Sequence, residues 1–231
     1  MYWEEADNKP KVPISDDVVD VVYKINCKTI PVDHAYSLYE SVKSILPWIE
    51  EAGVGLHTIH VVTSGNGWMR PEDPDELLYL SKRTRFSIRV PNAHIADAKK
   101  LCGMELDIKG NKLLVDEMNI KYLEPVETLF CRYLVTGENN NDEEKFLASI
   151  FEQLKSLDIH ARKMMCGKEN NIKTPDGIIK TRSMMLADLD EEDSIKLQQV
   201  GLGSLQHMGC GLFIPHRGIK AVSSIAPNSD K

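Results

Sequence analysis

One order of strand and helix patterns occurs twice along the 231-residue chain, and this repetition limits the fold more than any other feature. Valine-rich residues 16–27 favour a strand, and residues 33–50 carry apolar side chains three and four positions apart, which predicts a helix with Asp33 as its N-cap. The rest of the first half is predicted as strands at 55–65 and 84–90, a helix at 92–103 and a hairpin at 104–123.

The second half repeats this order. Its predicted elements are a strand at 128–137, a helix at 143–157, a long hairpin within 160–187, a helix at 190–200 and a short strand at 210–215. Two such units are typical of tandem ferredoxin-like (RRM-like) domains, an α+β fold with helices on one face of each antiparallel sheet. We therefore expect a polar leader at 1–17, an N-terminal domain at 18–124, a C-terminal domain with a glycine-rich loop at 125–217, and a tail at 218–231.

Composition indicates a soluble, cytoplasmic protein. A formal net charge of -7 argues against a chain coated uniformly with nucleic acid. Five widely spaced cysteines include no C-x-x-C pair, which predicts neither a zinc site nor a redox motif and fits a reducing compartment. No apolar run reaches the roughly 20 residues of a membrane span, and the acidic N-terminus lacks a signal-like apolar region, so we expect no membrane contact.

Residues 201–213, GLGSLQHMGCGLF, contain four glycines: Gly201, Gly203, Gly209 and Gly211. The segment follows a helix, opens a strand and contains no G-K-[ST], so it matches neither a dinucleotide fingerprint nor a phosphate loop. On one interpretation Gly201 is a helix C-cap and the remaining glycines form a wide turn. Gly209 and Gly211 do not fit this interpretation, because they flank the start of a strand, where glycine marks a bulge or a close approach by another backbone. On the other, exposed N–H groups with Gln206 and His207 bind the phosphates of a polynucleotide.

Local charge favours an anionic partner. Residues 82–112 contain eight Lys and Arg against three Asp and Glu, and residues 160–182 contain six against two. Arg83 and Arg85 alternate along a predicted strand, which would place two guanidinium groups on one face of a sheet. Solvated lysines on hairpins are the alternative explanation for any single residue.

Four segments resemble the CRISPR-associated Cas-six endoribonucleases of the Myxan type. They are IPVDHAYSLY (30–39), GLHTI (55–59), GNG (65–67) and GLGSLQHMGCGLFIP (201–215). The resemblance implies a protein that binds the hairpin repeat of a precursor CRISPR transcript and cuts it once, without metal or cofactor, to release guide RNAs for antiviral defence. It also implies 5′-hydroxyl and 2′,3′-cyclic phosphate products, a hairpin that stays bound, and a guide-RNA effector complex as a further partner. Ser204, Leu205 and Gln206 depart from the arginines expected inside the terminal loop.

Metal-free RNA cleavage needs a base for a ribose 2′-hydroxyl, and histidine suits this role. At the start of the first predicted helix, His34 would sit where the helix dipole favours a neutral imidazole. His57 follows the helix, and the resemblance carries a histidine there too. Tyr36, Tyr39 and Lys43 lie on the polar flank of the helix, where they would orient the ribose or stabilise the phosphate. The predicted catalytic residues are His34, His57 and Tyr36.

The predicted RNA contacts come from the basic hairpins and the glycine loop. The hairpin at 160–182 is expected to protrude and follow the RNA stem. The contact residues are Arg83, Arg85, Arg162, Lys163, Arg182, Gly201, Gly203, Gln206, His207, Gly209 and Gly211.

Two alternative functions remain open. A non-cleaving subunit would bind the RNA hairpin within a guide-RNA complex. A small-molecule sensor would bind a metabolite between paired ferredoxin-like domains and would show no RNA affinity.

Overall fold

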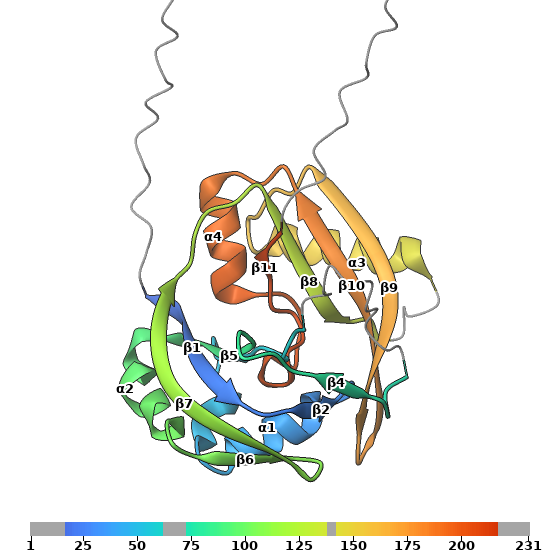
Figure 1. Cartoon of the computed structure of the whole chain (residues 1–231). Helices are drawn as coiled ribbons and strands as arrows, with labels where there is room; N and C mark the ends of the chain where they lie inside the picture. The colour runs from blue at the N-terminus through green and yellow to red at the C-terminus, as the bar shows by residue number, and fades with distance from the viewer. Residues whose placement is uncertain (1–16, 62–72, 138–141, 217–231) are drawn as a thin grey trace, which may run out of the picture.

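The computed structural model describes residues 17–61, 73–137 and 142–216, and these form two larger antiparallel sheets, one from each half of the chain, and a separate two-stranded ribbon (Figure 1). The strands of the N-terminal sheet are β1 (Val18–Asn26), β3 (Gly55–Leu56), β5 (Arg85–Pro91), β6 (Glu105–Ile108) and β7 (Asn111–Tyr122), in the order β3-β5-β1-β7-β6. The strands of the C-terminal sheet are β8 (Thr128–Val135), β9 (Lys163–Thr174), β10 (Gly177–Ala187) and β11 (Ile214–Pro215), in the order β11-β8-β10-β9.

The two sheets share one arrangement of strands. In each half the first strand is central: β1 lies between β5 and β7, and β8 lies between β10 and β11. In each half a strand from the end of the unit returns beside its first strand: β7 beside β1, and β11 beside β8.

Helices cover one face of each sheet. The N-terminal half has α1 (Ala35–Lys43), η1 (Pro47–Glu50), η2 (Asn92–His94), α2 (Ile95–Ala98) and η3 (Lys99–Leu101). Side chains that alternate along β1, namely Val19, Val21 and Tyr23, are fully buried in the same cluster as Leu38 and Val42 of α1. On the opposite face of β1, Asp20 accepts hydrogen bonds from Arg89, which also reaches the C-terminal half through the carbonyl of Gln198.

The C-terminal half has α3 (Glu143–Ser156), α4 (Glu191–Val200) and the short turn η5 (Gln206–Met208). The predicted stripe of Phe146, Ile150 and Leu154 on α3 is buried in the second core, which confirms that interpretation. Both longer helices begin at aspartates whose carboxylates accept a backbone N–H, Asp142 from Lys145 and Asp190 from Asp193.

The first helix is shorter than its apolar spacing predicts. It ends at Lys43, because Leu46 precedes Pro47 and takes a non-helical conformation (φ -119°, ψ 82°). The prediction that Asp33 caps the helix is wrong: His34 is the N-cap residue, and no side chain caps that end. The Asp33 carboxylate instead accepts the backbone N–H of Lys173, 3.0 Å away in the C-terminal sheet.

The strand predicted at 55–65 is limited to Gly55–Leu56 as β3. The N–H of His57 makes one more bond, to the carbonyl of Ser87 at 3.0 Å, and the chain then leaves the sheet. An unexpected ribbon pairs β2 (Thr29–Pro31) with β4 (Leu77–Tyr79). The predicted leader, the GNG segment at 65–67 and the predicted tail fall almost entirely outside the described residues.

Across the described ranges, no helix is both long enough and apolar enough to cross a membrane.

Candidate functional site

The glycine loop, residues 201–213, lies at the junction between the two sheets. Gly201 is the C-cap of α4 with φ 64°, as one interpretation predicted. Gly211 has φ 67°, and a Cβ there would lie 1.9 Å from the carbonyl oxygen of Leu202. At Gly209 a Cβ would lie 2.7 Å from the Thr58 methyl carbon and 3.1 Å from the Leu56 oxygen. The predicted close approach is thus confirmed, since the loop rests directly on the end of β3.

The loop does not offer a cradle of exposed N–H groups. The N–H of Gly201 donates to Leu197, that of Gly209 to Gln206 and that of Gly211 to Tyr133, and all three glycines are buried. The Gln206 side chain donates to the Val200 carbonyl at 2.7 Å. The prediction of a backbone phosphate cradle at these three glycines is therefore wrong, because the N–H groups hold the loop against its own half. Any RNA contact by Gly203, Gln206 or His207 remains a prediction.

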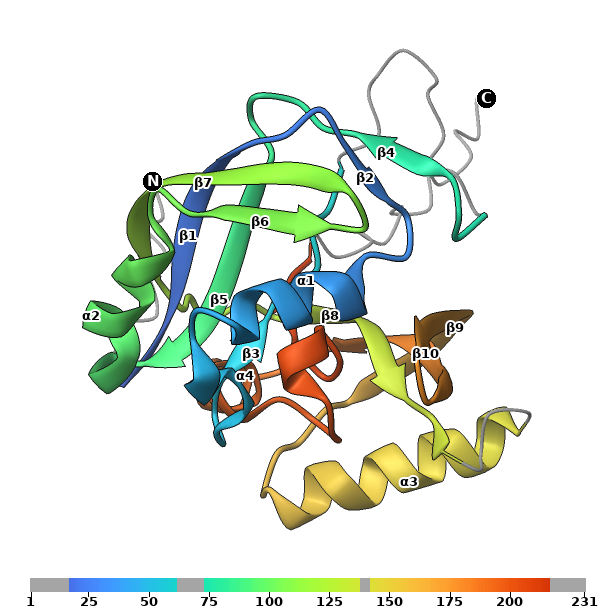
Figure 2. The ribbon, with the colours of Figure 1, turned by 90° about the horizontal axis from the view of Figure 1, so that it is seen from below.

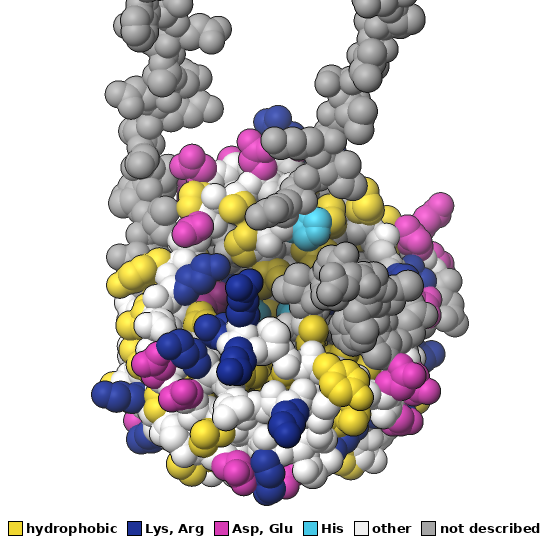
Figure 3. Space-filling view, in the orientation of Figure 1, with side chains coloured by type: hydrophobic (Ala, Val, Ile, Leu, Met, Phe, Trp, Pro, Cys, Tyr) yellow, Lys and Arg dark blue, Asp and Glu magenta, His cyan; other side chains and the backbone are white. Residues whose placement is uncertain are grey.

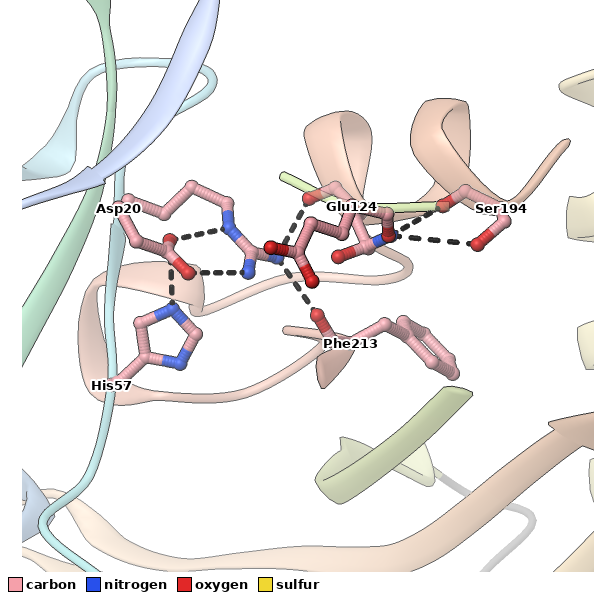
Figure 4. Close-up of polar contacts among 7 residues, drawn as sticks. Asp20, His57, Glu124, Ser194 and Phe213 are labelled. Atoms are coloured by element: carbon pink, nitrogen blue, oxygen red, sulfur yellow. Dashed lines mark hydrogen bonds and ion pairs between the residues drawn. The ribbon is translucent and has the colours of Figure 1, made fainter. Parts of the chain in front are cut away.

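A buried polar network joins the halves beside this loop (Figure 4). Arg89 is 1% exposed and bonds both carboxylate oxygens of Asp20, at 2.8 and 3.0 Å. Its third nitrogen, Nη1, donates to the carbonyls of Gln198 at 2.7 Å and Phe213 at 2.9 Å, which belong to the C-terminal half. One guanidinium from β5 therefore ties β1 to α4 and to the end of the glycine loop.

His57 belongs to this network. Its Nε2 lies 3.4 Å from Oδ1 of Asp20, within ion-pair range but without hydrogen-bond geometry, and its side chain is 11% exposed (Figure 4). Burial by itself raises the pKa of Asp20, but the adjacent His57 and Arg89 outweigh burial and hold that pKa far below its usual range. Asp20 therefore stays ionised and can orient the His57 ring.

His34 is buried with both ring nitrogens occupied. Nε2 lies 2.9 Å from the N–H of Ile59, which can only donate, so Nε2 must be the unprotonated acceptor. Nδ1 then carries the proton and donates to the Pro31 carbonyl at 2.9 Å. The ring thus fastens the start of α1 to residue 59. A catalytic role for His34 remains a prediction, and the described structure gives it no accessible nitrogen.

A second cluster forms where η5 of the glycine loop meets α1 and η1 (Figure 2). We call Tyr39, Lys43, Glu50 and His207 the α1–loop cluster. The rings of Tyr39 and His207 have their centroids 4.8 Å apart, and Lys43 Nζ lies 2.9 Å from the Tyr39 hydroxyl and 3.0 Å from the Glu50 carboxylate. The Tyr39 hydroxyl donates to Glu50. Tyr36, the predicted catalytic tyrosine, lies beside this cluster with its ring centroid 6.0 Å from that of Tyr39.

Electrostatics keep the α1–loop cluster in defined protonation states. Burial lowers the pKa of His207, with Glu50 opposing that shift and Lys43 adding to it. The hydrogen bonds to Tyr39 and Glu50 raise the pKa of Lys43. Burial and the bond to Glu50 raise the pKa of Tyr39. At neutral pH the cluster therefore holds a neutral imidazole beside a lysine that remains charged.

Beyond Asp20 and Arg89, the face of the N-terminal sheet opposite α1 is basic. In the strand register Lys24 lies directly opposite Arg85, and Asp20 lies directly opposite Lys121. These side chains therefore share the face of the sheet opposite buried Val21. We call exposed Lys24, Arg85 and Lys121 the basic face, and Figure 3 shows Lys and Arg side chains gathered over this region. Lys24 forms an ion pair with Glu117.

The two predicted arginines are not equivalent. Arg83 lies in a turn before β5, so the expectation that it alternates with Arg85 along the strand is wrong. The prediction also missed Lys24 and Lys121, because they stand on strands distant in sequence and add little to any local charge count. The signal for Lys24 was the alternation of polar with apolar side chains along β1.

The hairpin at 160–182 does not project freely from the C-terminal half. Lys173 donates from its backbone to Asp33 and from its side chain to Asp75 at 3.1 Å, which attaches the hairpin to the N-terminal half. Arg182 is occupied by Glu169 at 2.6 Å and Glu143 at 3.5 Å. Lys163 pairs with Asp188 at 3.0 Å, and Arg162 is exposed. The predicted RNA contacts of these three basic residues remain predictions.

No group of three His, Cys, Asp or Glu side chains within the described residues is placed to hold a metal ion.

These features define a class of mixed α/β protein in which two antiparallel sheets of matching strand order are joined through a glycine-rich loop and a buried arginine. The family model described as Cas6 CRISPR matches residues 19–218, and the chain belongs to that family.

Individual relatives agree with this assignment. The chain is 30% identical over 198 residues to the CRISPR-associated endonuclease Cas6 of Myxococcus xanthus (strain DK1622), covering 85% of this chain and 81% of the relative. A solved CRISPR-associated protein Cas6 superposes with a TM-score of 0.58 at 11% identity, covering 87% of this chain and all of that one. A Cas6-related protein from Pyrococcus furiosus superposes with a TM-score of 0.56 at 15% identity, covering 85% and 98%. These two solved structures are similar in fold.

Proposed function

We propose that the protein is an endoribonuclease that binds CRISPR repeat RNA and cuts the precursor transcript into guide RNAs. The observation that carries this proposal is membership of the Cas6 family along nearly the whole chain, together with a curated relative named as an endonuclease. The basic face supports an RNA ligand, since clustered Lys and Arg side chains supply the sequence-independent part of nucleic-acid affinity.

The finer architecture belongs to the same proposal. Residues 18–124 and 125–217 act as two ferredoxin-like domains, which the repeated strand order supports. They are joined rigidly, because the glycine loop, Arg89 and the bond from Lys173 to Asp33 all cross from one half to the other. A rigid junction suits a nuclease that must hold one phosphodiester in a fixed position.

The reaction needs no metal in this proposal. A histidine takes the proton of a ribose 2′-hydroxyl, the 2′-oxygen attacks the adjacent phosphorus, and the 5′-oxygen leaves, which gives a 2′,3′-cyclic phosphate and a 5′-hydroxyl. Two histidines of the junction support this chemistry: His57, oriented by Asp20, and His207 in the α1–loop cluster. His34 is assigned a structural role, because both of its nitrogens are already bonded.

Cleavage of the matching repeat RNA in the presence of EDTA tests this function. We expect one cut per repeat and fragments that accept a 5′-phosphate from polynucleotide kinase without prior dephosphorylation. A repeat with a single 2′-deoxy nucleotide immediately 5′ of the cut should bind and stay intact, because it lacks the attacking hydroxyl.

Three outcomes separate the competing functions. Cutting only when Mg²⁺ is present would contradict the metal-independent mechanism. Tight binding of the repeat without any cut would identify a non-cleaving hairpin-binding subunit. Absence of RNA affinity at low salt would contradict an RNA ligand altogether.

A further inference from the structure

The α1–loop cluster contains an imidazole and an ammonium group, which the proposed cleavage needs as a base and as a phosphate contact. These groups are accessible to a ligand. The side chains of Lys43 and Glu50 are 41% and 44% exposed, and His207 is partly exposed. Among the described residues, neither ring nitrogen of His207 makes a hydrogen bond, in contrast to both nitrogens of His34. The cluster is thus open to a ligand, whereas His34 is not.

We propose that His207 is the proton acceptor of the cleavage reaction and that Lys43 holds the scissile phosphate. This assignment rests on the proposed nuclease function and deepens it by placing the chemistry on the α1 side of β3. His57 is then a positioning residue, because it acts through Asp20 on the network that joins the halves.

The reaction balances with these residues. A ring nitrogen of His207 takes the proton from the ribose 2′-hydroxyl, and the 2′-oxygen forms a bond to phosphorus as the bond from phosphorus to the 5′-oxygen breaks. The leaving 5′-oxygen takes a proton from water, and the imidazolium returns its proton to the solvent. Lys43 stabilises the charge on the non-bridging oxygens, and two of its three N–H groups are already directed by Tyr39 and Glu50.

The surroundings of His207 fit a base near neutral pH. The charged and titratable groups that face it are Tyr39 and Lys43 from α1 and Glu50 from η1, while the contacting strand β3 contributes only Gly55 and Leu56. Raised pKa values keep Tyr39 protonated and Lys43 charged, and hydrogen bonds from Tyr39 and Lys43 lower the pKa of Glu50. Of these groups, His207 is the one that changes charge between about pH 5 and 8.

The test uses single-turnover cleavage of the repeat RNA by the full chain, with protein in excess. We expect His207→Ala to lower the cleavage rate constant at least about 100-fold, while its Kd for the 2′-deoxy repeat stays close to the wild-type value. Added imidazole should restore part of the lost rate. A residue with a merely structural role would show no such rescue.

The pH profile gives a second readout. In the wild type the rate constant should rise with pH through the pKa of His207, which burial places below that of an ordinary histidine. In His207→Ala this dependence should be absent. Lys43→Met should lower the rate constant, and Lys43→Arg should recover part of it, because arginine keeps the positive charge.

His216→Ala is the matched control, since His216 is exposed on the C-terminal half and lies outside the predicted RNA contacts, and it should cut at the wild-type rate. If His207→Ala fails to fold, His207→Gln is judged by the same criteria. Wild-type cutting by a folded His207 variant would overturn this assignment and leave the nuclease function intact. A wild-type protein that binds the repeat and never cuts would instead contradict the proposed function.

Discussion

At the scale of single residues, the buried ion pair of Asp20 and Arg89 should affect the free energy of unfolding strongly. Removing Arg89 takes two hydrogen bonds from the Asp20 carboxylate and leaves it with His57 at 3.4 Å, and breaking such a buried pair costs about 3–5 kcal/mol. We therefore expect Arg89→Met to lower the free energy of unfolding by about that amount, measured by urea denaturation. The double variant Asp20→Asn with Arg89→Met should be much less destabilised, because no buried charge remains. Equal destabilisation of both proteins would show that packing, not charge, dominates at this position.

The same pair gives the protein a defined response to acid. The pKa of Asp20 is lowered in the folded state, so below the unfolded value of about 3.9 the unfolded chain binds a proton that the folded chain does not. The free energy of unfolding should therefore fall as the pH is lowered from about 5 towards 2. Asp20→Asn should reduce this slope in denaturant titrations made at several pH values. An unchanged slope would mean that other carboxylates account for it.

At the scale of elements, the glycine loop should tolerate little change, because several of its glycines stand where a Cβ would meet backbone atoms. Gly211→Ala places a Cβ 1.9 Å from the Leu202 carbonyl at φ 67°, so strain and overpacking together should cost about 2–5 kcal/mol in urea denaturation. Gly203→Ala is the matched control. Gly203 has a similar φ of 71°, but it is exposed and its Cβ would meet only Leu134 at 3.7 Å, so about 1–2 kcal/mol is expected. Equal costs at the two positions would contradict the close approach inside the loop.

Elements were predictable from sequence where one local pattern decides them. The spacing of Phe146, Ile150 and Leu154 was enough for α3, and the turn at Lys109 and Gly110 was enough for the hairpin of β6 and β7. The end of α1 was missed because its apolar spacing continues past Pro47, which breaks the helix while leaving Ile49 buried. The length of β3 was missed because the glycine loop, distant in sequence, lies over its end.

At the scale of the whole molecule, the candidate site was hard to predict because both of its centres combine residues from the two halves. The motifs pointed to α1 and the glycine loop, which the structure brings into contact. Nothing in the spacing showed that His207 would contact the Tyr39 ring, or that Arg89 would bond the carbonyl of Phe213. His34, the most prominent histidine of the motifs, turned out to hold the backbone of Ile59. Such contacts depend on how the halves dock, which local patterns do not encode.

The two candidate surfaces lie on opposite faces of the N-terminal sheet. The basic face shares its side of β1 with Asp20, whereas the α1–loop cluster lies on the side covered by α1. An RNA that contacts both must pass around the edge of the sheet. With His207 as the proposed base, binding and chemistry should be separable, because the basic face is then remote from the reacting atoms.

Charge reversal on the basic face tests this separation. Arg85→Glu with Lys121→Glu should raise the Kd for repeat RNA and reduce the slope of log K against log salt by about 0.7–0.9 per lost phosphate contact. At saturating protein the single-turnover rate constant should stay at the wild-type value, since the bound RNA still reaches His207. Lys155→Glu, an exposed change on α3, is the control and should alter neither quantity. A fall in the rate constant at saturation would place the scissile phosphate on the basic face and move the chemistry towards His57.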